Sequence, residues 1–262
     1  MAFVHSDAHL HLVDLFERDP GFASLVPGPD WRGAVVSHDI GEFARSEALR
    51  AELPPTIAGF GIHPQGIRSD TADFLSALAA EGRIGFIGEA GFDFFGDRPE
   101  RVRNDENLAR QRQAFEFQLS LAIGKGLPLL VHSRKAMDIL LGYGPEMKRL
   151  PALIFHGWPG RAQDALAFLG KGVPAYFSFG TTLLRSAKHA IETCRAIPED
   201  RILSETDAPW QPPAGVTWSR PDLIIAVADT LAAIRKVDPA SMRQLLRSNF
   251  DEAFRLKRKG NG

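Results

Sequence analysis

The sequence predicts an α/β fold of the (β/α)8 TIM-barrel type, on three observations. Eight apolar runs bounded by turn residues recur along the 262 residues, separated by amphipathic segments of helix length. This alternation is typical of a parallel sheet, and eight parallel strands close into a barrel. The length also suits one such domain, so we expect residues 1–262 to form a single barrel domain.

Each element follows from its apolar pattern. We expect strands at 3–9, 32–38, 56–63, 84–89, 127–132, 152–156, 175–179 and 202–207. We expect helices at 41–52, 72–81, 106–124, 135–143, 162–169, 183–195, 222–236 and 241–256. Asp70 and Asp105 are expected as helix N-caps, and Gly82, Gly124 and Gly170 as helix ends.

Two segments interrupt this pattern. Residues 12–31 include Pro20, Pro27, Gly28 and Pro29, and we expect a long loop over the barrel mouth. Residues 211–219 are expected to form a second such loop. The chain after Arg255 is expected to be the solvated end of the last helix.

Composition and charge exclude several classes of protein. The formal net charge is −1, which excludes a protein that coats nucleic acid through a general basic surface. The single Cys194 excludes an intramolecular disulfide and fits a reducing compartment. The first residues lack the pattern of a signal peptide, and the chain has no run of about 18 apolar residues. We therefore expect a cytoplasmic protein without a membrane span, and we predict no obligate protein partner.

Residues that bind metal ions follow five of the predicted strands. The stretch 87–93 places Glu89 at the end of the fourth strand, between Gly88 and Gly91. The other four strand ends carry His9 with His11, His132, His156, and Glu205 with Asp207. Residues i and i+2 of a strand face the same side, and barrel enzymes keep their chemistry at the carboxyl ends of the strands. The sequence therefore predicts a metal site at the barrel mouth.

Each of these residues alone has an ordinary structural explanation. A His-X-His pair is often incidental, a single His132 or His156 can be a hydrogen-bond donor, and Asp207 before Ala208-Pro209 can initiate a turn. Five of the eight histidines, however, fall at predicted strand ends: residues 9, 11, 63, 132 and 156. The remaining histidines are expected to be structural, with His5 at the start of a strand and His189 in a helix. His38 ends the second strand and could reach the barrel mouth, but we expect it in packing or solvent. Cys194 is expected to be a small buried hydrophobic residue.

Imidazole and carboxylate ligands together favour one or two divalent ions such as Zn, Mg or Mn. A carboxylate can bridge two ions about 3.5–4 Å apart, and such a pair lowers the pKa of a shared water molecule. The sequence does not specify which metal binds.

These motifs together resemble those of the TatD-type metal-dependent hydrolases and deoxyribonucleases, a branch of the amidohydrolase-like barrels. The resemblance extends from Asp7 to about Leu256. It rests on Asp7-X-His9-X-His11-Leu12, Gly61-Ile62-His63-Pro64, Ile87-Gly88-Glu89-X-Gly91-Phe92-Asp93, Gln111-X-X-X-Phe115-X-X-Gln118-Leu119, His132-X-Arg134 and Glu205-Thr206-Asp207-X-Pro209.

The resemblance implies roles for the matching residues. One metal would be held by His9, His11, Glu89 and Asp207. A second would be held by Glu89, His132 and His156, with Glu89 as the bridge. The catalytic residues would be Asp207, Glu89 and Glu205, and Glu205 would orient the water or the substrate beside Asp207. His63 and Arg134 would contact substrate oxygens, and Asp93 is expected to cap its own loop.

The chain departs from the family pattern at the rim of the predicted site. Gln65 stands where relatives often have a second histidine, and Gly157-Trp158-Pro159-Gly160 replaces the common Cys-Phe-Ser/Thr-Gly turn. Neither change removes a predicted ligand. Both bear on substrate choice rather than on metal binding.

The predicted function is that of a divalent-metal-dependent hydrolase, a phosphodiesterase or deoxyribonuclease that cleaves DNA ends with metal-activated water. A small phosphoester is the other phosphate substrate we expect. One alternative is hydrolysis of a small amide or lactone on the same metals, and another is a non-enzymatic scaffold that retains metal. The tryptophans 31, 158, 210 and 218 are candidates for stacking on bases. At least two of them, Trp31 first, are expected to pack under loops instead.

Overall fold

The computed structural model describes residues 4–96 and 98–256, and its eight strands form one parallel sheet in the order β1 to β8. Each strand pairs with its neighbour in the sequence. The strands are β1 (His5–Leu10), β2 (Trp31–Val35), β3 (Thr56–Phe60), β4 (Phe86–Asp93), β5 (Leu129–Arg134), β6 (Leu153–Phe155), β7 (Ala175–Phe179) and β8 (Ile202–Ser204). The predicted fold class is therefore confirmed.

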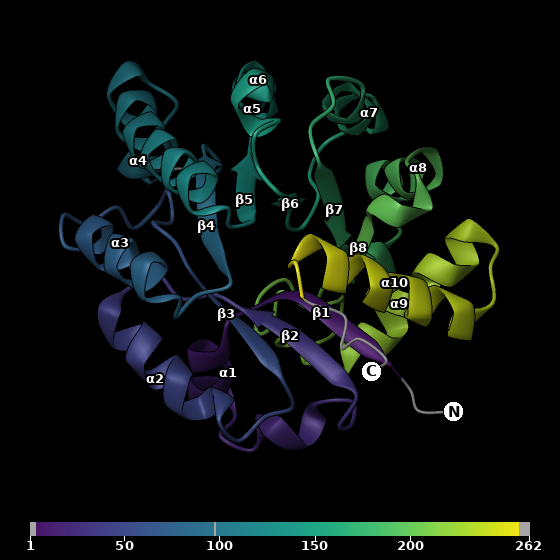
Figure 1. Cartoon of the computed structure of the whole chain (residues 1–262). Helices are drawn as coiled ribbons and strands as arrows, with labels where there is room; N and C mark the ends of the chain where they lie inside the picture. Colours follow the sequence, from purple (N-terminus) through teal and green to yellow (C-terminus); the bar gives the residue numbers. More distant parts are fainter. Residues whose placement is uncertain (1–3, 97, 257–262) are drawn as a thin grey trace, which may run out of the picture.

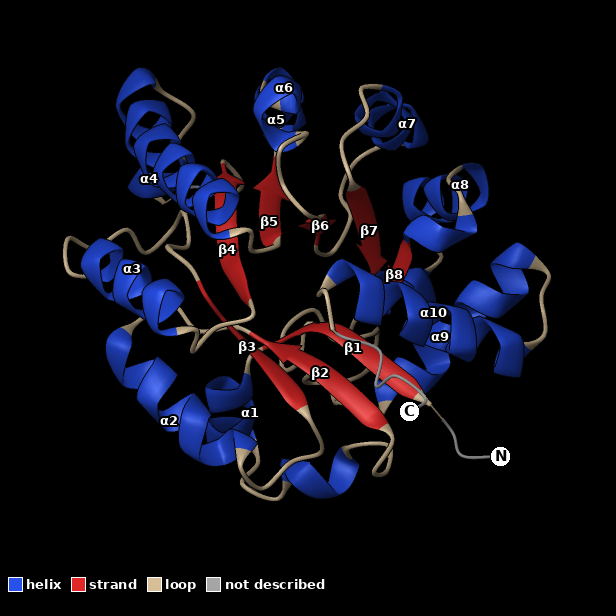
Figure 2. Ribbon diagram, viewed as in Figure 1, coloured by secondary structure: helices blue, strands red, loops and turns tan. Residues whose placement is uncertain are grey.

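Helices surround the strands on the outside, as Figures 1 and 2 show. The α-helices are α1 (Leu12–Arg18), α2 (Ile40–Arg50), α3 (Thr71–Glu81), α4 (Asp105–Lys125), α5 (Met137–Gly142), α6 (Gly144–Met147), α7 (Ala162–Gly170), α8 (Lys188–Ala196), α9 (Leu223–Arg235) and α10 (Pro239–Ala253). Four short 3₁₀ helices accompany them: η1 (Phe22–Leu25), η2 (Pro99–Arg101), η3 (Thr181–Arg185) and η4 (Glu199–Arg201). No helix in the described part of the chain is long and apolar enough to cross a membrane.

The first and last strands meet and nearly close the barrel. Leu10 forms a parallel bridge with Ala208, and the amide of His11 donates to the carbonyl of Ala208 at 2.8 Å. The hydroxyl of Ser204 donates to the carbonyl of Ser6 at 2.8 Å. The contacts across this seam bring the first and the last ligand motif of the chain together.

A layer of hydrophobic side chains lies beneath the predicted site residues. Leu130, Ile154 and Leu203 are fully buried and stand two residues before His132, His156 and Glu205. Residues two apart share a face of the sheet. The same cluster includes Phe250 and Phe254 from the C-terminal helix region, so apolar packing fixes the strands directly below the site.

Several strands end earlier than the sequence predicts. β2, β3 and β8 stop at Val35, Phe60 and Ser204, whereas β4 continues to Asp93. His63 and Asp207 therefore stand on the loops after their strands. Gly91 explains part of the β4 geometry: its φ is 149°, and a Cβ there would lie 2.0 Å from the carbonyl oxygen of His132. Only glycine allows β4 and β5 to approach this closely.

The prediction of one long loop at 12–31 is wrong. The segment forms α1 and η1, and Trp31 is the fully buried first residue of β2. Leu12, Val13 and Leu15 bury one face of the short α1. A seven-residue helix is too short to give a clear periodicity, and the nearby prolines and glycine suggested a loop.

Helix ends were predicted with mixed success. Gly82 is the left-handed C-cap of α3, as expected, but α4 passes Gly124 and ends at Lys125, with Gly126 as its left-handed C-cap (φ 65°). Asn104, not Asp105, caps α4, because its side chain accepts the amide of Asn107. Asp70 occupies the N-cap position of α3 without a capping hydrogen bond, and Gly170 is the last residue of α7.

The predicted helix at 183–195 is divided into η3 and α8, with a left-handed Ser186 between them (φ 57°). The predictions for Phe3 and for the tail beyond Leu256 fall outside the described residues. Cys194 is a buried residue of α8, as expected.

Candidate metal centre

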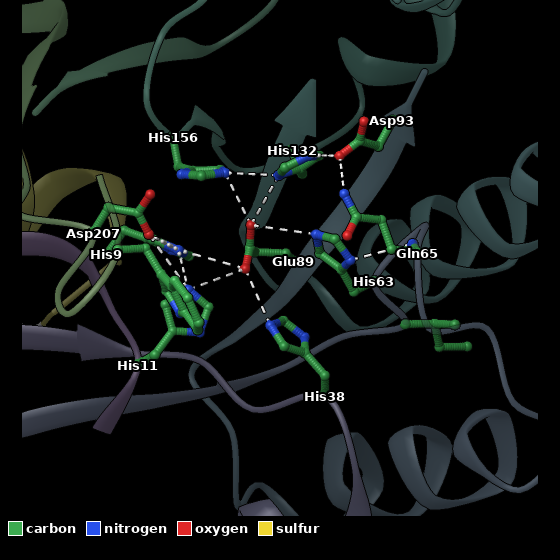
Figure 3. A network of polar contacts seen from close by, with 12 residues as sticks. His9, His11, His38, His63, Gln65, Glu89, Asp93, His132, His156 and Asp207 are labelled. Carbon is green, nitrogen blue, oxygen red and sulfur yellow. Dashed lines mark hydrogen bonds and ion pairs between the residues drawn. The ribbon is translucent and has the colours of Figure 1, made fainter. Parts of the chain in front are cut away.

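The carboxylate of Glu89 lies at the centre of the site, and each of its oxygens faces a different pair of histidines (Figure 3). Oε2 lies 3.5 Å from His9 Nε2 and 3.6 Å from His11 Nε2. Oε1 lies 2.9 Å from His156 Nε2 and 3.2 Å from His132 Nδ1. One carboxylate is thus shared between two sets of donor atoms.

The first donor set has the dimensions of a tetrahedral metal site. Asp207 Oδ1 lies 3.3 Å from His9 Nε2 and 3.4 Å from His11 Nε2, and the two histidine nitrogens are 3.1 Å apart. A tetrahedral ion with bonds of about 2.0–2.1 Å has ligand atoms about 3.3 Å apart. His9, His11, Glu89 and Asp207 therefore fit one divalent ion.

The second donor set is equally compact. His132 Nδ1 and His156 Nε2 are 3.0 Å apart, and both face Glu89 Oε1. His63 Nε2 lies farther from the same oxygen, at 4.0 Å. The ligand atoms of His63, Glu89 and His132 nevertheless fall within 4.8 Å of one another, so His63 stands beside this second position.

Burial and charge make these groups unusual acids and bases. Burial alone would raise the pKa of Glu89, but the imidazoles of His9, His156 and His132 outweigh it and hold the pKa well below its usual range. Burial likewise opposes the charge on His11, yet its contact with Asp207 and the charge of Glu89 raise the pKa of His11 to about 9. Buried carboxylates and imidazoles packed this closely form a site that a cation would neutralise.

Asp93 supports the second donor set from behind. Its Oδ2 lies 3.0 Å from His132 Nε2, on the opposite side of the ring from Glu89. Its Oδ1 accepts the backbone amide of Phe95 at 2.8 Å, which is the expected loop cap. These contacts outweigh burial and lower the pKa of Asp93 to about 2. A carboxylate that holds the far nitrogen of a metal-binding histidine fixes its tautomer and orientation.

Two glutamines of α4 hold the backbone around the site. The side chain of Gln111 pairs with the amide and carbonyl of Asp93, and that of Gln118 pairs with the amide and carbonyl of Ile62. Both side chains are buried. The glutamine motif of this helix thus fixes the positions of Asp93 and of the turn that carries His63.

At the barrel seam, Asp7 anchors the residues that precede Asp207. Its carboxylate accepts the Thr206 hydroxyl at 2.6 Å and the Thr206 amide at 2.9 Å. Asp207 itself has φ 53°, and Gln211 donates from its side-chain amide to Asp207 Oδ2. Asp7 belongs to a motif in the sequence, but the sequence alone did not indicate that Thr206, after β8, is its partner.

Glu205 is fully buried and contacts the turn after the sixth strand rather than the cavity. Its Oε1 accepts the amide of Gly157 at 2.6 Å and lies 3.7 Å from His156 Nδ1. The expectation that Glu205 and Asp207 share a face assumed that β8 continues through both residues. β8 ends at Ser204, so the side chains of Glu205 and Asp207 do not share a face and contact different residues.

The expectation for His38 is wrong. His38 follows β2, and its Nε2 lies 3.1 Å from Glu89 Oε2, between the rings of His11 and His63. No local pattern pointed to this position, because His38 belongs to no recurring motif and follows a strand that stops at Val35. His5 and His189 are placed as expected, at the start of β1 and on the exposed surface of α8.

A cavity of about 630 Å³ opens above the donor atoms. Its wall includes Arg134 from the end of β5, Arg98 and Arg101 from the β4–α4 loop, and the exposed rings of Phe95 and Trp210. Of the four tryptophans, only Trp210 combines exposure (54%) with a place in this wall. Trp31 and Trp158 are buried, and Trp218 packs against the core.

The chain is similar to known proteins over nearly its whole length. The family model described as TatD related DNase matches residues 6–255. An uncharacterized metal-dependent hydrolase of Mycoplasma genitalium is 26% identical over 95% of this chain and 98% of its own. A protein of Musicola paradisiaca named 3'-5' ssDNA/RNA exonuclease TatD is 29% identical over 76% of this chain and 77% of its own.

A solved structure agrees with these sequence relatives. The TatD homolog YjjV of Escherichia coli is 31% identical in sequence over 85% of each chain. Its crystal structure superposes with a TM-score of 0.85, covering 98% of this chain and 100% of its own. The family model, these relatives and the shared barrel establish that the chain belongs to the TatD related DNase family.

Proposed function

We propose that this protein is a divalent-metal-dependent phosphodiesterase that acts on the ends of single-stranded nucleic acid. The observation that carries the proposal is the division of the Glu89 carboxylate between two compact donor sets. Two ions held close together stabilise the attacking and leaving oxygens in phosphatases and nucleases. The exonuclease name of the Musicola paradisiaca relative supports the same substrate class.

Each donor residue receives a role in this proposal. His9, His11, Glu89 and Asp207 would hold one ion, and Glu89, His132 and His156 would hold the second. When bound, such ions lower the pKa of a coordinated water and offset the charge of a phosphate. The side chains that carry these ligand atoms are buried, so solvent reaches them mainly through the cavity above.

Asp207 is the residue we assign to accept the proton of the attacking water. The imidazoles of His11 and His9 overcome the effect of burial and depress the pKa of Asp207, so it is ionised at neutral pH. Its Oδ2 is oriented by Gln211. Glu205, which approaches His156 Nδ1, is assigned to orient that ligand.

His63 and Arg134 are assigned to the substrate. Burial and the neighbouring His132 lower the pKa of His63 well below its usual value, so the ring is neutral and can donate one hydrogen bond to a phosphate oxygen. Arg134 lines the cavity and offers a planar guanidinium fork.

We also propose that the enzyme is cytoplasmic, because its single cysteine is a free, buried thiol, which fits a reducing compartment.

The test is a substrate panel on protein loaded separately with Zn, Mn and Mg. The panel contains single- and double-stranded DNA, RNA, small phosphodiesters, amides and lactones. We expect cleavage of single-stranded ends and of small phosphodiesters, and loss of both in Glu89→Gln, with Glu116→Gln on α4 as the exposed control. Cleavage restricted to amides or lactones, or no hydrolysis by any metallated form, would refute the proposal.

A further inference from the structure

Three arginines line one side of the cavity, and none of them forms an ion pair with a carboxylate in the described part of the chain. Arg98 and Arg101 come from the loop between β4 and α4, and Arg134 comes from the end of β5. Among the described residues, no carboxylate oxygen lies within 4.0 Å of a nitrogen of any of the three guanidinium groups. Their charge is therefore available to an anion in the cavity.

The neighbouring Arg103 shows the contrast. It belongs to the same loop, but it forms an ion pair with Asp138 and lies over the ring of Phe94. It does not line the cavity. The loop thus places one arginine in a surface ion pair and leaves two others facing the cavity.

Arg101 is held in place by a neutral group. Its Nη2 donates to the side-chain oxygen of Gln65 at 2.5 Å, and the Gln65 amide donates to Asp93 Oδ2. Arg101 Nε is buried and has no hydrogen-bond partner among residues 4–96 and 98–256. An amide satisfies one donor of the guanidinium without neutralising its charge, so Arg101 remains an ordered cation with an unused donor.

This chain of contacts also fixes where Arg101 stands relative to the donor atoms. Glu89 contacts His132, His132 contacts Asp93, and Gln65 then links Asp93 to Arg101. Figure 3 shows the part of this chain that runs from Glu89 to Gln65. Two side chains, Asp93 and Gln65, therefore stand between Arg101 and the donor residue His132, and an anion bound at Arg101 is distinct from a phosphate held at the metal position.

An aromatic ring accompanies the arginines. Phe95 is 51% exposed, lines the same cavity, and lies 5.3 Å from the guanidinium carbon of Arg134. Its backbone amide is bound by Asp93, which fixes the base of the side chain. An exposed ring beside cationic groups is the combination that binds a base and its phosphate in single-stranded nucleic acid.

The opposite wall of the cavity is different. There Trp210 donates from Nε1 to Asp14, and Asp14 itself lines the wall. The arginines among the wall residues are those at 98, 101 and 134. The cavity thus has its arginines on the side of the β4–α4 loop and the end of β5, whereas Trp210 and Asp14 line it elsewhere.

We propose that Arg98, Arg101 and Arg134 form a second phosphate subsite, with Phe95 as its base-stacking surface, that binds the phosphate neighbouring the one to be cleaved. The proposal rests on the phosphodiesterase function proposed above and specifies its substrate. The preferred substrate has at least two phosphates linked through a nucleoside, rather than an isolated phosphodiester.

The experiment compares dithymidine substrates that differ by one terminal phosphate. Metallated wild type is assayed on TpT, on pTpT and on TpTp, and the double variant Arg98→Gln/Arg101→Gln is assayed on the same three. We expect one of the phosphorylated forms to exceed TpT in kcat/KM by about tenfold, mainly through KM, because the terminal phosphate gains charge-assisted hydrogen bonds from the arginines. The double variant should bring that ratio close to one.

The matched control is Arg103→Gln, which removes a cation from the same loop without touching the cavity. It should keep the wild-type ratio. The salt dependence of KM gives a second readout: the logarithmic slope should fall by about 0.7 for each phosphate that the double variant no longer binds.

The outcomes separate this proposal from the function on which it depends. Equal kcat/KM for all three substrates, or an unchanged ratio in the double variant, would overturn the subsite while leaving the phosphodiesterase in place. If no substrate is cleaved, the proposed function fails, and calorimetric titration with the phosphorothioate-linked dinucleotides decides the subsite. Equal affinity for the forms with and without a terminal phosphate would then overturn it as well.

Discussion

Asp93 Oδ2 lies 3.0 Å from Nε2 of His132, and the other ring nitrogen of that histidine faces Glu89. The contact gives Asp93 a function beyond capping its loop. It fixes the imidazole so that Nδ1 points to the shared carboxylate, and it joins the metal centre to Gln65 and the arginine side of the cavity.

Asp93→Asn tests this connection. An amide can keep the bond to Phe95, but it removes the charge beside His132 and allows the wrong tautomer. We expect affinity for the second metal to fall by about 10–100-fold, as for other groups that orient a metal ligand. Metal titration against a chelator measures the loss, with Asp138→Asn as an exposed control. Unaltered affinity at both positions would contradict the assigned role.

The first metal position is tested by replacing His9 and His11 together with alanine. Two of its four donor atoms are lost, and we expect the metal content to drop by one equivalent in protein purified without chelator. Elemental analysis provides the measurement, and His189→Ala on α8 is the control. The first site would have to be placed elsewhere if the double variant bound as much metal as wild type.

Asp207→Asn separates catalysis from folding. The change retains the shape of the side chain but removes the group that would accept the proton of the water. We expect kcat to fall by about 10²–10⁴-fold at saturating metal, while the circular dichroism spectrum and Tm stay close to wild type. Full activity in this variant would exclude Asp207 as the base.

Metal binding is expected to depend steeply on pH. In the metal-free protein the pKa of His11 is about 9, because the contacts with Asp207 and Glu89 outweigh burial, and Glu89 and Glu205 likewise overcome burial to raise the pKa of His156. Both rings are protonated at pH 7 and must lose a proton to bind metal. Apparent affinity should therefore rise by about tenfold per pH unit, for each proton displaced, as the pH increases toward 9.

The raised pKa values of His11 and His156 make the metal-free protein less stable as the pH increases, whereas they make metal binding stronger. A histidine whose pKa is higher in the folded state stabilises the fold fully below the unfolded pKa of about 6.5, and this contribution is lost as the pH rises through the folded value. Metal-free protein should thus become less stable between pH 6.5 and 9. Urea unfolding at several pH values checks this, and a smaller decline is expected in His11→Gln.

For the metal-binding prediction, a metal affinity that is constant from pH 6 to pH 9 would refute the assignment of His11 and His156 as ligands.

Thr206→Val tests the seam between β1 and β8. It removes the hydroxyl that donates to the fully buried Asp7 and leaves that carboxylate short of one partner. We expect a loss of about 1–3 kcal/mol in the free energy of unfolding, measured by urea titration. Thr217→Val, on the loop after β8, is the control. A stability equal to wild type would show that the hydroxyl contributes nothing at the seam.

Local patterns in the sequence were sufficient to predict the fold class and the central donor residues. Eight apolar runs predict eight strands, because strand periodicity and helix periodicity are local properties. The motif residues His9, His11, Glu89, His132, His156 and Asp207 follow from the same local reasoning. Their side chains do converge in the structure, because the carboxyl ends of parallel barrel strands meet at one face.

The resemblance to a known family implied the division of those residues into two donor sets, but the contacts that surround them became apparent only in the folded barrel. The allocation of one Glu89 oxygen to each pair of histidines, the approach of His38 and the contact of Asp93 with His132 all join residues from different strands and loops. The availability of Arg101 depends in the same way on Gln65, 36 positions earlier in the chain. Such contacts are set by where each strand ends and how the barrel closes. A shift of one or two residues at a strand end redirects a side chain, and no local pattern fixes that position.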